Sequence, residues 1–153
     1  MPVVHYFAYG SNMNPARVRE RGLVVRAMLA GRLPGYALRF DKQSAAHLGT
    51  GHANLVRDFA ETAEGVLYEL VSEAEILKMD PFEHAPINYG REVVEVETHR
   101  GLVPAWTYFA NDAVRAPDAR PEQAYLAHLL AGRPFLSEAW YARLAAWPTV
   151  DGA

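Results

Sequence analysis

The four residues Tyr9-Gly10-Ser11-Asn12 stand between a strand-like run and a segment typical of a helix start. A polar loop with a glycine at this place presents several backbone N–H groups, and such groups bind anions and developing negative charge. The same pattern is also typical of an ordinary strand-to-helix turn. The loop is therefore a candidate substrate site if other features of the chain point to the same chemistry.

Glu83 is the acidic residue most suited to acid–base chemistry. It lies in a stretch with prolines on both sides, Pro81 and Pro86, which limit the freedom of the loop backbone. The neighbouring Phe82 is expected to lower the local dielectric, and this raises the pKa of a carboxyl group toward neutrality. A solvated loop glutamate is the alternative interpretation. Asp80, three residues earlier, is better explained as turn or cap chemistry than as half of an acid pair.

Several other chemistries lack the residues they need. The chain has no cysteine, which excludes thiol nucleophiles, thiolate metal sites and disulfides. Ser11 is not surrounded by the G-x-S-x-G pattern of a serine hydrolase. The histidines form no H-E-x-x-H motif or other close pair of metal ligands, and "HLGTGH" lacks the lysine of a phosphate-binding loop. We therefore expect neither a metal nor a cofactor.

Length and charge restrict the setting and the partners. A chain of 153 residues is expected to form a single domain, residues 1–153, whose core needs no disulfide. The net charge of −3 is spread along the chain, and no basic block predicts a nucleic-acid partner. The first residues lack the features of a signal peptide, and no apolar run reaches about 18 residues, so we expect no membrane partner and a cytoplasmic location.

The hydrophobic pattern predicts an α+β protein with a mainly antiparallel, barrel-like sheet and a few flanking helices. The expected strands are 3–9, 23–32, 36–42, 65–71, 91–98 and 102–110, and the expected helices are 15–22, 72–79, 121–132 and 138–147. A turn at 33–35 is expected to separate the second and third strands. The glycine-containing stretch 39–56 is expected to include a loop that returns to a short strand near Asn54. Glu83 then lies in a loop between a helix and a strand.

Local patterns support several of these elements. Asn14 and Ser137 are expected to cap the helices that follow them, and Ser72 with Glu75 three residues later has the pattern of a capping box. The alternation of polar and apolar residues in 91–98 predicts a half-buried strand, and 102–110 is its expected hairpin partner.

Several short motifs follow one another along nearly the whole chain. They are Tyr9-Gly10-Ser11-Asn12, "GYALRF", "ANLV", "EGVLYEL", Asp80-x-x-Glu83, Tyr89-x-Arg91, "AWTYFA" and the helical ending "AYLAHLLAG…LSEAWYARL". Together, in this order, they resemble the gamma-glutamylcyclotransferase-like family. The order and spacing of the motifs are more specific than any one of them alone.

The resemblance implies a small barrel-like α+β fold in which the loop 9–12 and the acidic loop face one pocket. Carried over by position, Glu83 is the general acid and base. The substrate-binding residues that the resemblance implies are Tyr9, Gly10, Ser11, Asn12 and Tyr89.

Two further positions bear on the resemblance. Arg91 is expected either to pair with a carboxylate or to lie on the outer face of the following strand. Family members often have glycine after the catalytic glutamate, whereas this chain has His84. The extra side chain is expected to narrow or polarise the pocket, which affects the choice of substrate.

The activity that the resemblance implies is the release of 5-oxoproline and a free amine from a gamma-glutamyl amide. The substrate's own α-amine attacks its γ-carbonyl, so the enzyme needs no nucleophile, in agreement with a chain that has no cysteine and no serine elbow. One carboxylate can remove a proton from the amine and return one to the leaving group. The N–H groups of the loop hold either the substrate carboxylate or the oxyanion.

Two other functions are compatible with these residues. One is a non-catalytic module that uses the same pocket to bind a small molecule. The other is a related enzyme that acts on a gamma-glutamyl group attached to a larger amine or natural product. A fold and a pocket do not by themselves establish catalysis. Glu83 favours an enzyme, because a module that binds anions gains nothing from an acidic side chain at that place. The expected partner is a small gamma-glutamyl compound.

Overall fold

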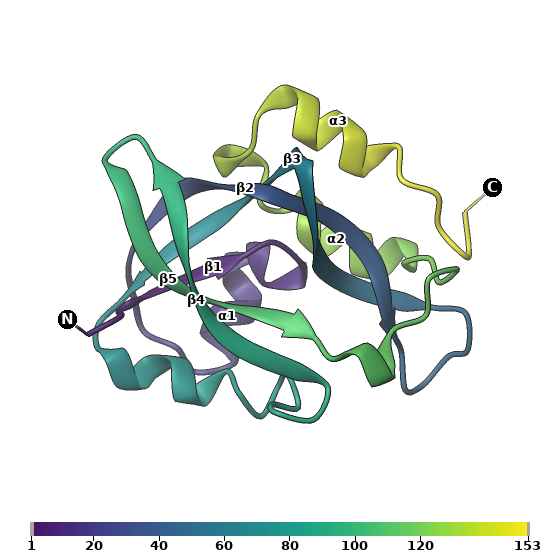
Figure 1. Ribbon diagram of the computed structural model, residues 1–153, viewed down its shortest axis with the longest axis horizontal. Coiled ribbons are helices and arrows are strands. Elements are labelled where there is room, and N and C mark those ends of the chain that lie inside the picture. Colours follow the sequence, from purple (N-terminus) through teal and green to yellow (C-terminus); the bar gives the residue numbers. More distant parts are fainter. Residues whose placement is uncertain (1, 153) are drawn as a thin grey trace.

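The computed structural model describes residues 2–152 and contains a closed barrel of five strands with helices packed outside it (Figure 1). The strands are β1 (His5–Ala8), β2 (Val25–Gln43), β3 (Gly51–Leu70), β4 (Tyr89–Thr98) and β5 (Gly101–Ala110). Their order around the barrel is β1-β3-β2-β4-β5. Neighbouring strands are antiparallel except β1 and β5, which meet in parallel at Tyr6 and Trp106. The predicted α+β class, with a mainly antiparallel barrel-like sheet, is confirmed.

The strands β2 and β3 form one long hairpin, shown in blue in Figure 1. The predicted turn at 33–35 is wrong, because β2 continues through it with a shift of register between Pro34 and Tyr36. Gly35 has a φ of +85° there, a backbone conformation that favours glycine. The irregularity acts as a bulge, which bends a strand without reversing it. The loop expected within 39–56 covers only residues 44–50, because β2 extends to Gln43 and β3 begins at Gly51.

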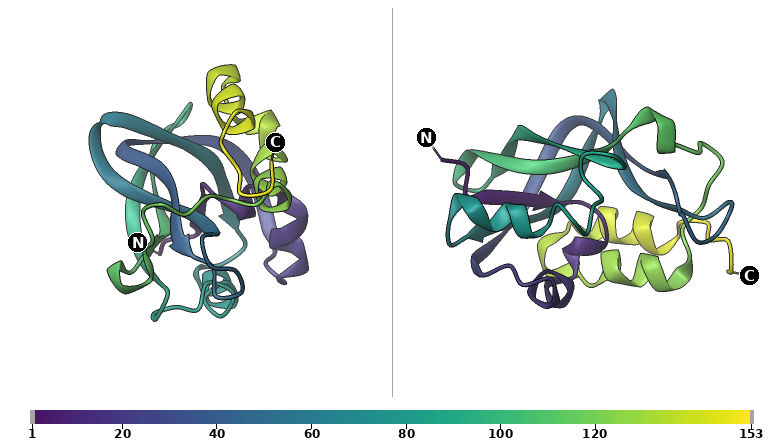
Figure 2. Two further views of the ribbon diagram at one scale, coloured as in Figure 1. Left: turned by 90° about the vertical axis from the view of Figure 1, so that its right-hand side faces the viewer. Right: turned by 90° about the horizontal axis from the view of Figure 1, so that it is seen from below.

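The helices are α1 (Pro15–Glu20), α2 (Gln123–Leu130) and α3 (Glu138–Ala145), with short 3-10 helices η1 (Ser11–Met13), η2 (Glu73–Lys78), η3 (Asp112–Val114) and η4 (Arg133–Phe135). Asn14 caps α1 by accepting from the N–H of Ala16, and Ser137 caps α3 by accepting from the N–H of Trp140. Figure 2 shows α2 and α3 side by side on one side of the barrel. Within residues 2–152, no helix has the length and hydropathy needed to cross a membrane.

The helix predicted at 72–79 is a 3-10 helix, η2, and its expected capping box does not form. The side chain of Ser72 makes no cap hydrogen bond. The Glu75 carboxylate instead pairs with Lys78 at 2.7 Å and accepts from the N–H of Val24. The capping box does not form because the Glu75 carboxylate binds Lys78 and the N–H of Val24, the residue before β2.

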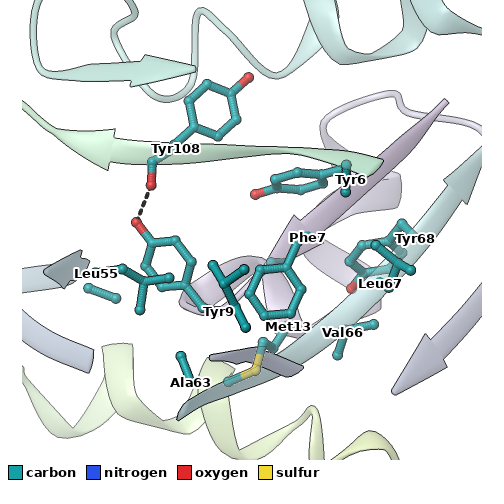
Figure 3. Close-up of a cluster of buried hydrophobic side chains, with 14 of the residues drawn as sticks. Tyr6, Phe7, Tyr9, Met13, Leu55, Ala63, Val66, Leu67, Tyr68 and Tyr108 are labelled. Carbon is teal, nitrogen blue, oxygen red and sulfur yellow. Dashed lines mark hydrogen bonds between the residues drawn. The ribbon is translucent and has the colours of Figure 1, made fainter. Parts of the chain in front are cut away.

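The core of the barrel is built around β1, whose Phe7 points into the centre (Figure 3). Gly31 of β2 lies opposite Gly65 of β3. A Cβ added at Gly31 would lie 3.1 Å from the Phe7 ring, and one added at Gly65 would lie 2.9 Å from it. The two glycines therefore make room for this side chain. Just beyond β1, the Tyr9 hydroxyl donates to the carbonyl of Tyr108 in β5, the dashed line in Figure 3. The start of the loop 9–12 is thus tied to the barrel wall.

Candidate active site

The loop 9–12 and Glu83 face one cavity of about 40 Å³, which we call the inner cavity. The loop leaves the end of β1, whereas Glu83 belongs to the turn-rich segment 80–88 between η2 and β4. The structure brings all six site residues predicted from the sequence to this cavity. Its lining consists mainly of tyrosines and the loop: Tyr6, Tyr9, Gly10, Ser11, Asn12, Ala53, Glu83, Tyr89, Tyr108 and Tyr125.

Glu83 is the only carboxylate among the residues that line the inner cavity, and its side chain is 16% exposed. Its Oε1 accepts a hydrogen bond from Asn12 Nδ2 at 3.1 Å and lies 3.9 Å from Nη1 of Arg21. Its Oε2 makes no hydrogen bond with the part of the chain that the structure describes. Burial raises the pKa of Glu83, and the Arg21 charge and the hydrogen bond from Asn12 oppose this effect. One carboxylate oxygen is therefore held in place while the other stays available.

The backbone of the loop supplies hydrogen-bond donors. The N–H groups of Gly10, Ser11 and Asn12 make no hydrogen bond within residues 2–152. Gly10 also packs closely, since a Cβ added to it would lie 2.8 Å from the Cβ of Ala53 and 3.4 Å from the Tyr125 hydroxyl. Free N–H groups beside a cavity are suited to binding a carboxylate or an oxyanion.

Asn12 connects the loop to the acid. Its Nδ2 donates both to Glu83 and to the hydroxyl of Tyr6, at 2.9 Å for the latter. Its Oδ1 accepts from Nη1 of Arg21 at 2.9 Å, and its backbone carbonyl accepts from the Tyr68 hydroxyl at 2.6 Å. The residue as a whole is 3% exposed. The hydrogen bonds to Asn12 thus fix the position of the loop relative to Glu83.

The tyrosine wall includes residues that the sequence did not reveal, namely Tyr6, Tyr108 and Tyr125. The Tyr89 hydroxyl donates to the carbonyl of Ala53 at 2.7 Å, and the Tyr125 hydroxyl accepts from the N–H of Ala53 at 2.9 Å. Burial raises the pKa of Tyr125 to about 12 and that of Tyr89 well above its usual value. The hydroxyls therefore stay protonated at neutral pH and shape a polar wall without adding charge.

Arg91 and Asp80 lie outside the inner cavity and form an anchor for the acidic loop. The Asp80 carboxylate accepts from Nε and Nη2 of Arg91 at 2.9 Å and 3.0 Å, and from the Tyr108 hydroxyl at 2.6 Å. The Arg91 guanidinium also stacks 4.2 Å from the ring centre of Trp106. The carboxylate that Arg91 binds is thus the protein's own, and Asp80 attaches the segment of Glu83 to β4 and β5.

A second hollow of about 310 Å³, which we call the outer cavity, adjoins the inner one and shares Ser11, Glu83, Tyr89 and Tyr125 with it. His84 borders the outer cavity, so its side chain does not narrow the inner one. Its φ of +51° lies in the left-handed region that favours glycine. In the described residues, no three His, Asp or Glu side chains are grouped so that they could hold a metal ion.

Comparisons with known proteins identify the fold and the family of the chain. The sequence model of the family described as gamma-glutamyl cyclotransferase, AIG2-like, matches residues 6–128. Among solved structures, the human uncharacterized protein loc79017 is similar with a TM-score of 0.83 at 21% identity, over 98% of this chain and 90% of that one. A gamma-glutamyl cyclotransferase is similar with a TM-score of 0.82 at 20% identity, over 97% and 90% of the two chains.

A yeast gamma-glutamyl cyclotransferase specific to glutathione is similar with a TM-score of 0.65 at 13% identity, over 94% of both chains. A search of curated protein sequences returns no significant match. At these identities the structural likenesses show the fold, whereas the family model matches well over half of the sequence. The chain therefore belongs to the gamma-glutamyl cyclotransferase, AIG2-like family.

Proposed function

We propose that this protein is an enzyme that releases 5-oxoproline and a free amine from a gamma-glutamyl amide, with Glu83 as general acid and base. The observation that carries the proposal is the presence, in one small cavity, of the available Oε2 of Glu83 and the free N–H groups of the loop 9–12. A positioned base and a set of donors for an oxyanion or carboxylate are the two parts that this reaction needs. Membership of the family supports the reaction class.

The reaction closes a five-membered ring within the substrate. Glu83 takes a proton from the α-ammonium group, and the freed amine nitrogen attacks the γ-carbonyl carbon, which forms the new C–N bond. The bond from that carbon to the leaving nitrogen then breaks. Glu83 relays to the leaving nitrogen the two protons that the attacking nitrogen loses, so the amine departs as an ammonium ion and Glu83 returns to its starting state.

The walls of the inner cavity have roles that follow from their contacts. The loop N–H groups bind the oxyanion or the α-carboxylate of the substrate. The tyrosine hydroxyls, which are held by hydrogen bonds to backbone and side chains, restrict the glutamyl chain so that its amine meets its carbonyl. Such restraint lowers the entropic barrier to ring closure.

The proposal keeps the remaining expectations from the sequence. These are a single domain over residues 1–153, a cytoplasmic location, a small gamma-glutamyl compound as the partner, and a reaction without metal or cofactor.

The test is the identity of the products formed from a panel of gamma-glutamyl amides. We expect 5-oxoproline and free amine, detected by chromatography, and the same rate with and without a chelator. Acetylation of the α-amine should abolish turnover because the nucleophile is lost, and so should moving the amide to the α-carboxyl group. Glutamate as the main product, or rapid turnover of the acetylated substrate, would contradict the proposal. Binding without any turnover would indicate a non-catalytic module instead.

A further inference from the structure

The segment 80–88, which carries Glu83, is a compact unit built from its own backbone hydrogen bonds. Within it, the N–H groups of Ile87 and Asn88 both donate to the carbonyl of His84 at 2.9 Å. The segment consists of turns and belongs to no helix or strand, so the barrel does not fix it through a ladder of backbone hydrogen bonds. The position of Glu83 at the inner cavity therefore depends on how the segment is attached to the barrel.

The two ends of the segment 80–88 are attached differently. At the first end, Asp80 accepts three hydrogen bonds from side chains of β4 and β5, so the loss of one bond leaves it attached. At the far end, Asn111 is the only side chain within residues 2–152 that hydrogen-bonds to residues 84–88. Its Nδ2 donates to the carbonyls of Pro86 at 2.7 Å and Ile87 at 2.5 Å. The far end thus depends on one amide group.

Two buried polar residues support Asn111 from within the barrel. The preceding residue, Ala110 at the end of β5, donates its N–H to Oδ1 of Asn54 in β3 at 2.9 Å. Asn54 is 2% exposed, and its Nδ2 donates to the carboxylate of Asp41 in β2 at 3.0 Å. Arg115 pairs with the same carboxylate at 3.0 Å. Buried polar groups with all their partners present form rigid networks, and this one leads to the backbone beside Asn111.

The side chain of Glu83 makes few contacts that could hold it by themselves. It accepts a hydrogen bond from Asn12 Nδ2 at 3.1 Å, and Arg21 lies 3.9 Å from the same oxygen. Both contacts reach Oε1, whereas the proposed reaction uses Oε2. A single hydrogen bond makes only a modest net contribution to the free energy of a conformation. The place of the carboxylate is therefore set mainly by the attachments of the segment 80–88.

We propose that Asn111 is a positioning residue for Glu83: by binding the carbonyls of Pro86 and Ile87, it keeps the carboxylate at the inner cavity. This inference rests on the proposed function. Glu83 lies between Asp80 and Pro86, so the hold at the far end limits its movement. With that end released, the segment can pivot about Asp80 and carry the base away from the reacting nitrogen. A displacement of about 1 Å at a reacting group lowers a rate by up to about 10²-fold.

The first test is the kinetics of Asn111→Ala, which removes the two side-chain hydrogen bonds and keeps the backbone bond from the N–H of residue 111 to the carbonyl of Asn88. With the most active amide of the panel, we expect kcat for 5-oxoproline formation to fall about tenfold to 10²-fold and KM to change less than about twofold. Asn111→Asp should lose at least as much, because its carboxylate repels the two carbonyl oxygens. A loss of stability alone would leave the kcat of the folded enzyme unchanged.

The second test is amide hydrogen exchange, which does not depend on turnover. In Asn111→Ala, a peptide that covers residues 80–88 should exchange faster than in the original protein, whereas peptides from β2 and β3 should keep their rates and so show that the barrel is folded. The matched control for both tests is Asp112→Asn, at the next residue, whose side chain is 98% exposed and pairs with Arg115 at 3.4 Å. It should keep both kcat and the exchange of the segment 80–88.

An unchanged kcat in Asn111→Ala would overturn the inference and leave the proposed function intact. A loss of turnover that matches the loss of folded protein, measured by urea unfolding, would also overturn it, since Asn111 would then act only on stability. If the original protein gave no 5-oxoproline from any amide, the proposed function would fail. The exchange experiment would then decide separately whether Asn111 holds the segment 80–88, because faster exchange supports this attachment and unchanged exchange rejects it.

Discussion

Asn12 donates a hydrogen bond to Glu83 at 3.1 Å across a sequence separation of 71 residues. Arg21 can only donate, and it bonds to Oδ1 of Asn12, so the amide nitrogen must face the carboxylate. The geometry thus specifies which Glu83 oxygen is held and which one is available. This relationship connects the two parts of the site that the chain supplies from different segments.

Asn12→Asp is expected to reduce activity at neutral pH about tenfold or more. The replacement keeps the shape but brings a second carboxylate next to Glu83, and two close carboxylates raise the pKa of one of them. The acid limb of the pH–rate profile should therefore move to higher pH. Asn14→Asp is the control, because it lies outside the inner cavity and aspartate caps a helix as well as asparagine does. An unchanged profile for Asn12→Asp would contradict the assigned role.

Glu83→Gln should lower turnover by about 10²–10⁴ while the protein stays folded, since the amide retains the shape and removes the base. The measurement is 5-oxoproline formation, with circular dichroism as the check on folding. Asp80→Asn is the comparison, and it should affect stability more than chemistry because Asp80 binds Arg91 and Tyr108 outside the inner cavity. An equal loss of turnover in both variants would indicate a shared carboxylate pair.

Activity should rise with pH through an apparent pKa above the ordinary glutamate value of 4.5, because burial raises the pKa of Glu83. Arg21→Gln removes a positive charge that opposes this rise in pKa, so the acid limb of the pH–rate profile should move to still higher pH. Arg19→Gln, on the exposed face of α1, should leave it in place. A limb that stays fixed or moves to lower pH in Arg21→Gln would contradict this account.

The same shift predicts a pH dependence of stability. The folded-state pKa of Glu83 lies above its unfolded value, so its contribution to the free energy of unfolding is complete below pH 4.5 and is lost as pH rises through the raised value. Urea unfolding at several pH values measures this contribution. Between pH 4.5 and the raised pKa, the free energy of unfolding should decline less in Glu83→Gln than in the original protein.

Gly10→Val should weaken substrate binding or turnover much more than Ser11→Ala. An added Cβ at Gly10 meets the Cβ of Ala53 at 2.8 Å, which forces the loop away from the cavity. The loop acts through its N–H groups, so loss of the Ser11 hydroxyl should matter little. Kinetics of both variants provide the measurement. If Ser11→Ala alone abolished activity, a side-chain role for that serine would replace the backbone role.

His84→Gly is expected to raise the free energy of unfolding by up to about 1 kcal/mol, measured by urea denaturation. His84 has a φ of +51°, a conformation that is unfavourable for residues with a Cβ and open to glycine. His99→Gly is the control at another exposed turn histidine, which does not have a positive φ, and it should lower stability. A similar decrease in both variants would contradict the strain at His84.

Local patterns were sufficient for much of the fold. The alternation in 91–98 predicted β4 and its hairpin partner, and the caps Asn14 and Ser137 were correct because each bonds to a nearby backbone N–H. The failures are tertiary. The proline and glycine at 34–35 make a bulge because β3 pairs on both sides of them. The Glu75 carboxylate accepts from the N–H of Val24, 51 residues away, instead of completing the local capping box. Neither partner is visible within the short windows on which such predictions depend.

The candidate site was predictable to the extent that it depends on short motifs. The loop 9–12 and the proline-flanked Glu83 carry local signals of turn chemistry, and both line the inner cavity. Tyr6 and Tyr125 carry none, because an aromatic residue in a strand or a helix has many ordinary explanations. Their places in the site arise from burial and from hydrogen bonds to other segments, which only the folded chain specifies.

The β2–β3 hairpin has a consequence for how such a site changes in evolution. Its tip, residues 44–50, contributes Ala45 and Ala46 to the outer cavity, whereas Glu83 is attached to β4 and β5 through Asp80. Insertions or deletions at the tip would reshape the outer cavity and leave the hydrogen bonds of Glu83 untouched. The site is in this sense modular, because the wall of the outer cavity and the position of Glu83 are encoded in segments of the chain that can mutate independently.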